Sequence, residues 1–257
     1  MSAIRIEKDS ATATVILSNP GKLNAIDVAM WEALAREFNA LSHDDQLRCI
    51  IVRGEGDNFA AGADIEEFAT VRATPAQGIQ YHMRIIAQAL AAIADCRHPT
   101  VAAIEGICVG GGLEIACVCD MRIASPSSQF GIPINRLGFA LAPLEMQHLL
   151  QLVGKAAAME ILLEGRVFNA SEAKDKGLIN RIAADVLAEA RKTAERIAHG
   201  APLAARMTKR LVHRLSVQPE SLTEQELNAV FALLDSQDYR EGVQAFLAKL
   251  EPVFFGK

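Results

Sequence analysis

Three consecutive glycines, Gly110–Gly112, lead directly into an apolar, helix-like segment, and they constrain the local fold more than any other feature of the chain. Glycine weakens a helix, so three at a helix start indicate that the backbone there closely approaches something else. The first N–H groups of a helix lack intrahelical acceptors and lie at the positive end of its dipole. They can therefore bind an anionic oxygen, although close packing against a neighbouring segment also accounts for the glycines.

Glu114 is the only charged side chain in the first turns after these glycines. A carboxylate in that place can exchange protons with the group whose oxygen is bound, or it can merely stabilise the helix dipole. A second turn of small residues, within Phe59–Phe68, follows the strand-like segment Cys49–Gly54. Two such turns can each supply one backbone N–H to the same oxygen, which is the geometry of an oxyanion hole.

Strand-like and helix-like segments alternate through much of the chain, which predicts a layered α/β domain. We expect strands at Ile4–Glu7, Thr12–Leu17, Cys49–Gly54, Pro99–Gly106 and Met121–Ser125, the first two forming a hairpin. Asp27 is the expected N-cap of a helix that runs to Ala40, and Thr74–Asp95 consists mostly of helix-forming residues.

From about Asp185 onward the pattern becomes entirely helical. We expect helices at Asp185–His199, Leu203–Leu215, Thr223–Leu234 and Tyr239–Leu250. Such a helical tail either packs back on the core or forms a subunit interface.

The formal net charge of -5 over 257 residues argues against a protein that chiefly coats nucleic acid or anionic membrane. The basic cluster within Arg206–Arg214 is more typical of a solvated helix face than of an RNA-binding surface.

Five cysteines without a CxxC pair suit a reducing compartment. The first residues do not read as a secretory signal, and no apolar run reaches the roughly 18–20 residues of a membrane span. We therefore expect a cytoplasmic protein without a metal site.

The chain resembles the crotonase, or enoyl-CoA hydratase/isomerase, family over nearly its whole length. The segments that carry the resemblance are LSNPGKLNAID (17–27), FAAGADI (59–65), PTVAAIEGICVGGGLEIACVCDMRIAS (99–125), VGKAAAMEILLEGRVFNASEAKDKGLIN (153–180) and DYREGVQAFLAKLEPVFFGK (238–257). The resemblance implies the crotonase fold, an α/β fold in which repeated ββα units form a spiral core. It also implies a core at residues 1–195 that holds the acyl-CoA site, and a helical region at 196–257 that forms a homotrimer or a dimer of trimers.

The resemblance further implies an acyl-CoA thioester as substrate, with coenzyme A as part of the substrate and no separate cofactor. The thioester oxygen would lie between the N–H groups of Ala63 and Gly111, which would stabilise an enolate-like intermediate, and Glu114 would transfer the proton. The residues implied along the CoA are Lys22, Leu23, Ala25, Ala61, Asp64, Ile65 and, from a neighbouring subunit, Phe254 and Lys257. The segment from Phe68 to Met83 is expected to form part of the acyl pocket wall.

One position departs from the pattern of the hydratases in this family, which place two glutamates around the substrate. The first corresponds to Glu114, but the second corresponds to Ile134 in the sequence QFGIPINRLGF. An isoleucine cannot carry protons, and it should dry the pocket and raise the pKa of Glu114 by desolvation. The expected reaction is therefore hydration, or a similar lyase reaction, through a single glutamate. The alternatives are a double-bond isomerase and an acyl-CoA-binding protein with low turnover.

Glu145 is a candidate substitute for the missing glutamate. It follows Pro143, which indicates a helix start, so Glu145 can equally be a first-turn acid that stabilises the helix dipole. The sequence leaves both interpretations open.

Overall fold

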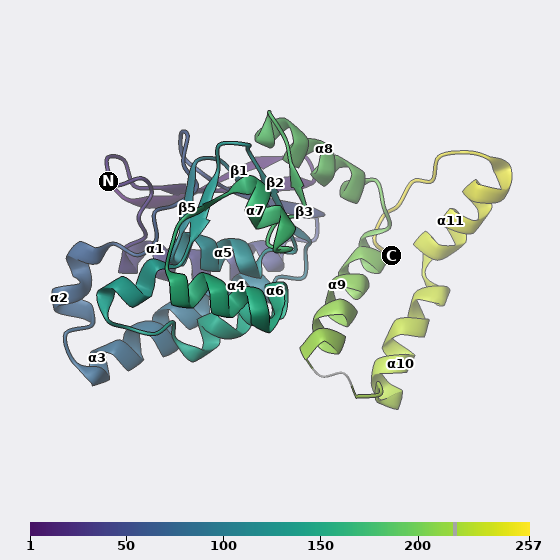
Figure 1. Cartoon of the computed structure of the whole chain (residues 1–257). Helices are drawn as coiled ribbons and strands as arrows, with labels where there is room; N and C mark the ends of the chain where they lie inside the picture. Colours follow the sequence, from purple (N-terminus) through teal and green to yellow (C-terminus); the bar gives the residue numbers. More distant parts are fainter. Residues whose placement is uncertain (218–219) are drawn as a thin grey trace.

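The computed structural model describes residues 1–217 and 220–257, which form two sheets covered by helices and a separate group of C-terminal helices (Figure 1). The larger sheet has the strand order β1-β2-β3-β4-β6-β9, and every neighbouring pair is parallel except β1 and β2. Its strands are β1 (Ala3–Asp9), β2 (Thr12–Ser18), β3 (Cys49–Gly54), β4 (Thr100–Ile104), β6 (Met121–Ala124) and β9 (Arg181–Ile182). The expected hairpin and the three later strands are confirmed.

A smaller sheet of short strands has the order β5-β7-β8. Its strands are β5 (Ile107–Val109), β7 (Gln129–Gly131) and β8 (Phe168–Asn169). Strand β5 leads directly into the glycine turn, so this sheet fixes the start of the helix that follows.

The helices before the C-terminal group cover both faces of the larger sheet. They are α1 (Val28–Ser42), α2 (Phe68–Val71), α3 (Pro75–Gln80), α4 (Ala87–Ala94), α5 (Gly111–Val118), α6 (Pro143–Glu164), α7 (Ala170–Asp175) and α8 (Val186–Ala198). Asp27 caps α1 as expected, because its carboxylate accepts a hydrogen bond from the Met30 amide at 2.8 Å. Pro143 is in the first turn of α6, also as expected.

The segment Thr74–Asp95 is helical, but it is not one regular α-helix. A single π-helical turn, Tyr81–Ile86, separates α3 from α4. Tyr81 and His82 are both buried in this turn. Turns of this kind are rare and frequently occur at functional sites, and the apolar pattern of the sequence does not distinguish them from an α-helix.

The larger sheet is buried on both faces, which explains why its strands are apolar at successive positions. Along β3, Ile50 and Val52 belong to the main core, which includes residues of α1, α4 and α5. Cys49 and Ile51 point to the other face and pack with α8. All five cysteines are buried with free thiols, and burial raises the pKa of the Cys117 thiol to about 12.

The C-terminal helices stand to one side of the core (Figure 1). They are α9 (Pro202–Val217), α10 (Glu224–Phe231), a 3₁₀ turn (Ala232–Asp235) and α11 (Gln237–Ala248). An ion pair of 2.9 Å between Lys209 and Asp120 ties α9 to the core. Helix α8 packs on the sheet and continues past residue 195 to Ala198. The expected division of the chain into a core (1–195) and a C-terminal helical region (196–257) stays a prediction. Within the described residues, no helix combines the length and apolarity needed to cross a membrane.

Candidate active site

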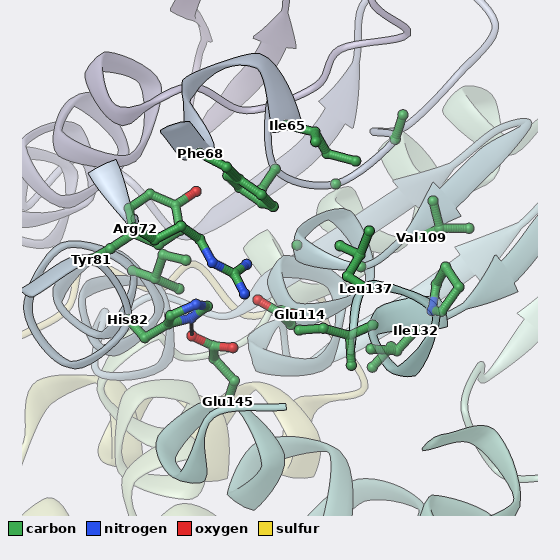
Figure 2. Close-up of a pocket in the computed structure, with 18 of the residues that line it drawn as sticks. Ile65, Phe68, Arg72, Tyr81, His82, Val109, Glu114, Ile132, Leu137 and Glu145 are labelled. Carbon is green, nitrogen blue, oxygen red and sulfur yellow. Dashed lines mark hydrogen bonds and ion pairs between the residues drawn. The ribbon is translucent and has the colours of Figure 1, made fainter. Parts of the chain in front are cut away.

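A cavity of about 260 Å³ lies where the two turns of small residues meet (Figure 2). Its lining includes Glu114 from α5, Glu145 from α6, and His82 and Tyr81 from the π-helical turn. Most of the other lining residues are apolar or glycine. Phe68, Tyr81 and His82, which belong to the segment expected to form part of the acyl pocket wall, all line this cavity.

Backbone hydrogen bonds hold the two turns side by side. The Ala60 amide donates to the Ile107 carbonyl at 2.9 Å, and the Val109 amide donates to the Ala60 carbonyl at 3.1 Å. This parallel bridge joins Ala60 to Cys108. Because the bridge lies just before Gly62 in one turn and Gly110 in the other, it places the following residues of both turns at the same end of the cavity.

The amides of Ala63 and Gly111 are oriented away from the bonds that hold these turns. Ala63 forms a parallel bridge with Ile26, and the two hydrogen bonds of this bridge use the neighbours of Ala63. The Ile26 amide donates to the Gly62 carbonyl, and the Asp64 amide donates to the Ile26 carbonyl. In a parallel bridge of this kind, the N–H of the central residue, Ala63, points to the side away from Ile26. Gly111 is the first residue of α5, and an N–H at that position has no intrahelical acceptor. Both residues line the cavity, so the structure brings the two expected donors together.

The three glycines are required for different reasons. Gly110 has a φ of +50°, a conformation that L side chains rarely adopt. A Cβ at Gly111 would stand 2.9 Å from Cζ2 of Trp31 and 3.5 Å from the Ala63 nitrogen, and a Cβ at Gly112 would stand 2.4 Å from the Ala60 carbonyl oxygen. Close packing against Trp31 and Ala60, together with the Gly111 amide that has no intrahelical acceptor, therefore explains the run of glycines.

Glu114 is buried in the first turn of α5, and its carboxyl group lies in the cavity. Burial raises its pKa well above the usual value of 4.5, and the nearby carboxyl of Glu145 raises it further. This is the direction expected from a pocket without the second glutamate. Ile134, at the corresponding position, lines the same cavity and supplies no proton carrier.

A second acidic group nevertheless reaches the cavity from another helix. Glu145 is 2% exposed, and its Oε1 lies 2.8 Å from Nδ1 of His82, which is also buried. The sequence marked Glu145 as a candidate but did not single out His82. Sixty-three residues separate the two along the chain. No local spacing could therefore have paired them; the only available signal was a lone histidine in an apolar helical run.

Comparisons with known proteins identify the family. A family model described as enoyl-CoA hydratase/isomerase matches residues 7–257. The chain belongs to the enoyl-CoA hydratase/isomerase family. A probable enoyl-CoA hydratase of Mycobacterium bovis is 35% identical over 257 residues, covering 98% of this chain and 97% of the relative. A peroxisomal Delta(3,5)-Delta(2,4)-dienoyl-CoA isomerase of Arabidopsis thaliana is 30% identical, covering 99% of this chain and 96% of the relative.

Solved structures of enoyl-CoA hydratase/isomerase family members confirm the crotonase fold. The crystal structure of an enoyl-CoA hydratase/carnithine racemase from Magnetospirillum magneticum matches with a TM-score of 0.96 and 44% identity, covering 100% of this chain and 97% of that one. An enoyl-CoA hydratase from Bacillus anthracis matches with a TM-score of 0.88 and 27% identity, covering 99% of each chain. The family acts on acyl-CoA substrates, but it includes both hydratases and isomerases, so membership does not decide the reaction.

The loop that the family resemblance implies for the CoA site is held by its own contacts in this chain. The Lys22 ammonium lies 2.7 Å from carboxylate oxygens of both Asp64 and Glu66, and these hydrogen bonds raise its pKa. The Ala61 amide donates to the Leu23 carbonyl at 3.0 Å. Five of the residues implied by the family resemblance thus lie at or beside this loop, and they are Lys22, Leu23, Ala25, Ala61 and Asp64. Their contact with CoA stays a prediction.

The remaining residues implied for the CoA site lie in two other places. Ile65 lines the cavity and is 59% exposed. Phe254 is half-buried and its carbonyl accepts a hydrogen bond from Arg48, while the Lys257 carbonyl accepts one from the amide of Asp238 in α11. The backbone of Phe254 thus contacts the core through Arg48, and that of Lys257 contacts α11. The role of both residues in a neighbouring subunit stays a prediction. Within the described residues, no cluster of three or more His, Cys, Asp or Glu side chains could hold a metal ion.

Proposed function

We propose that the protein is an enoyl-CoA hydratase that adds water across the double bond of a 2-enoyl-CoA. The thioester oxygen binds between the amides of Ala63 and Gly111, and Glu114 transfers the proton at Cα. The observation that supports this proposal most is that Ala63 and Gly111 line the same cavity as the buried carboxyl group of Glu114. Membership of the enoyl-CoA hydratase/isomerase family supports it.

The two amides suit the charge that develops during the reaction. When a nucleophile adds at Cβ, the electrons of the double bond move toward the thioester oxygen and form an enolate. Preorganised N–H donors stabilise that charge more than the neutral carbonyl, and losing one such donor typically costs on the order of 3 kcal/mol of transition-state stabilisation. Backbone amides provide this without a charged side chain, which agrees with the mostly apolar lining of the cavity.

Glu114 is suited to act as an acid toward the enolate. Because its pKa is raised, the carboxyl group keeps its proton at a higher pH than an exposed glutamate does. It can therefore deliver that proton to Cα when the enolate collapses. A single group that moves a proton between carbons would also suit an isomerase, but the polar pair of Glu145 and His82 in the same cavity favours a reaction that includes water.

The proposal is tested with crotonyl-CoA, a short trans-2-enoyl-CoA. Hydration removes the conjugated double bond, so the enoyl absorbance should fall and a product heavier by one water should appear in mass spectrometry. Glu114→Gln should abolish this reaction while the dissociation constant for CoA stays the same. Conversion of 3-enoyl-CoA to 2-enoyl-CoA without hydration would instead indicate an isomerase. Binding without turnover across enoyl-CoAs of increasing chain length would indicate an acyl-CoA-binding protein.

We also propose that the protein assembles through its C-terminal helices into a trimer or a dimer of trimers. Phe231, Phe246, Leu247 and Leu250 are each more than 60% exposed on this helical group in the single chain. Large apolar side chains exposed to this extent on one helical group are typical of a surface that another protein chain covers. Light scattering coupled to size-exclusion chromatography measures the mass directly, and a monomer at micromolar concentration would contradict the assembly.

A further inference from the structure

The pair formed by His82 and Glu145 is buried in the cavity beside Glu114, and the proposed function does not yet use it. We propose that His82 is the general base that removes a proton from the attacking water, and that Glu145 positions His82 for this step. The inference rests on the proposed hydration of an enoyl-CoA. It gives the cavity a second proton carrier on α6 and the π-helical turn, in place of the one missing at Ile134.

The geometry of the pair determines which ring nitrogen is free. The side chains of His82 and Glu145 are 6% and 1% exposed, and Nδ1 lies 2.8 Å from Oε1. In the proposed arrangement the ring hydrogen is on Nδ1 and is donated to Oε1 of Glu145, which leaves Nε2 with a free lone pair. Nε2 is buried and has no hydrogen-bond partner among the described residues. Buried polar atoms are almost always paired, so a water or a substrate atom is the natural partner of Nε2.

The imidazole ring is held on several sides. Tyr81 packs edge-on against it with ring centroids 5.1 Å apart, and Phe139 stacks on it at 5.3 Å. In Figure 2 the His82 ring and the carboxyl groups of Glu114 and Glu145 end in the same part of the cavity. A fixed ring with one satisfied and one open nitrogen is the arrangement that a general base needs.

Three further charged residues line the cavity around the pair of His82 and Glu145. Glu114 faces the pair from α5, and the cations of Arg72, after α2, and of Arg136, before α6, also line the cavity. The Arg72 guanidinium lies over the Phe68 and Phe139 rings, at 4.3 and 4.6 Å from their centroids. In the proposed reaction Glu114 delivers its proton to Cα, so removal of the proton from water is assigned to a second group, and His82 lines the same cavity.

The step balances with these two groups. The water oxygen forms a bond to Cβ while one O–H bond breaks and its proton moves to Nε2 of His82. The electrons of the double bond move to the thioester oxygen, held by the amides of Ala63 and Gly111. The enolate then takes the proton of Glu114 at Cα. His82 has gained one proton and Glu114 has lost one, and transfer of that proton from His82 to Glu114 through water restores both groups.

The test separates the chemistry of water from the chemistry at Cα. Hydration of crotonyl-CoA needs both groups, whereas deuterium exchange at Cα of butyryl-CoA in D₂O needs only Glu114 and the two amides. His82→Gln should lower kcat for hydration by about 10²–10⁴-fold. The KM for crotonyl-CoA and the exchange rate should stay close to those of the unmodified protein. His148→Gln, which changes a histidine on α6 outside the cavity, serves as the matched control and should leave both reactions unchanged.

Glu145→Gln tests the positioning role. A glutamine amide can donate to Nδ1 and so move the ring hydrogen to Nε2, which removes the base without removing the ring. We expect hydration to fall and exchange to persist, as for His82→Gln. His82→Ala should regain part of its hydration activity when imidazole is added to the assay, because a free imidazole can occupy the vacated space.

The outcomes distinguish this inference from the proposed function. Unchanged hydration in His82→Gln would overturn the role of His82. Parallel loss of hydration, exchange and CoA binding in the folded His82 and Glu145 variants, without rescue by imidazole, would show a structural role and would overturn it too. If the unmodified protein does not hydrate crotonyl-CoA or longer enoyl-CoAs, or if Glu114→Gln keeps full activity, the proposed function itself fails.

Discussion

Replacing Gly111 by alanine tests the proposed oxyanion site at its most restricted point. The new Cβ would stand 2.9 Å from Cζ2 of Trp31, whereas carbon atoms in contact prefer about 3.5–4.0 Å. Either the Trp31 ring or the start of α5 must therefore move by at least about 0.6 Å, the difference between 3.5 and 2.9 Å. Trp31 is fully buried, so the backbone of Gly111 is expected to take part of the shift.

This displacement should affect catalysis more than folding. Overpacking of a core by one carbon typically costs about 1–3 kcal/mol of stability. A misplacement approaching 1 Å at a reacting centre can cost about 10²-fold, and complete loss of one oxyanion donor costs about 10²–10³-fold in kcat. We expect kcat for crotonyl-CoA hydration to fall by about 10–100-fold in Gly111→Ala. The protein should remain folded.

Steady-state kinetics and thermal unfolding measure the two effects separately. Trp31→Phe in the same chain removes the ring atoms nearest the new methyl group, so it should restore part of the lost activity if the clash displaces the amide. The matched control is Trp31→Phe alone. A Gly111→Ala protein with the kcat of the unmodified protein would refute the assignment of the Gly111 amide to the oxyanion site.

Three further predictions follow from the structure. The raised pKa of Glu114 contributes stability that is fully present below its unfolded-state value of 4.5 and is lost as the pH rises through the folded-state value. At neutral pH, Glu114→Gln should therefore unfold at a higher urea concentration than the unmodified protein. This difference in unfolding midpoint should shrink as the pH approaches 4.5, and a difference independent of pH would contradict the raised pKa of Glu114. Phe246→Glu, at a side chain that is 83% exposed in the single chain, should shift the assembly toward monomers in light scattering, and an unchanged mass would exclude this face from the interface. Lys22→Met should weaken CoA binding by less than about tenfold, since an exposed ion pair contributes at most about 1 kcal/mol, and calorimetry at two salt concentrations should show the difference fading at high salt.

Features set by short sequence patterns could be predicted reliably. Asp27 caps the helix that begins at the next residue, as expected, because the capping bond spans only three residues. Glu114 and the glycine run were recognisable for the same reason, since a strand, a turn and the first helical turn are consecutive in sequence. Ile134 could be placed only through the resemblance to a family, and the structure puts it at the cavity.

Features that depend on distant segments could not be predicted. The contact between His82 and Glu145 joins a π-helical turn to the first turn of α6, and the apolar pattern around His82 is that of an ordinary buried helix. The short strands β5, β7 and β8 span three residues or fewer each, which is too short for a recognisable alternation. Within α6, Gly154 has a φ of +74° and interrupts the helix at a point where the sequence shows only one glycine among helix formers.

A crystal structure of the protein with a non-reactive acyl-CoA thioester analogue tests the central claim most directly. We predict that the thioester oxygen lies about 2.7–3.1 Å from the amide nitrogens of both Ala63 and Gly111, with the Glu114 carboxyl group beside Cα. A thioester oxygen that contacts neither amide, with the acyl chain bound elsewhere, would contradict the proposed chemistry.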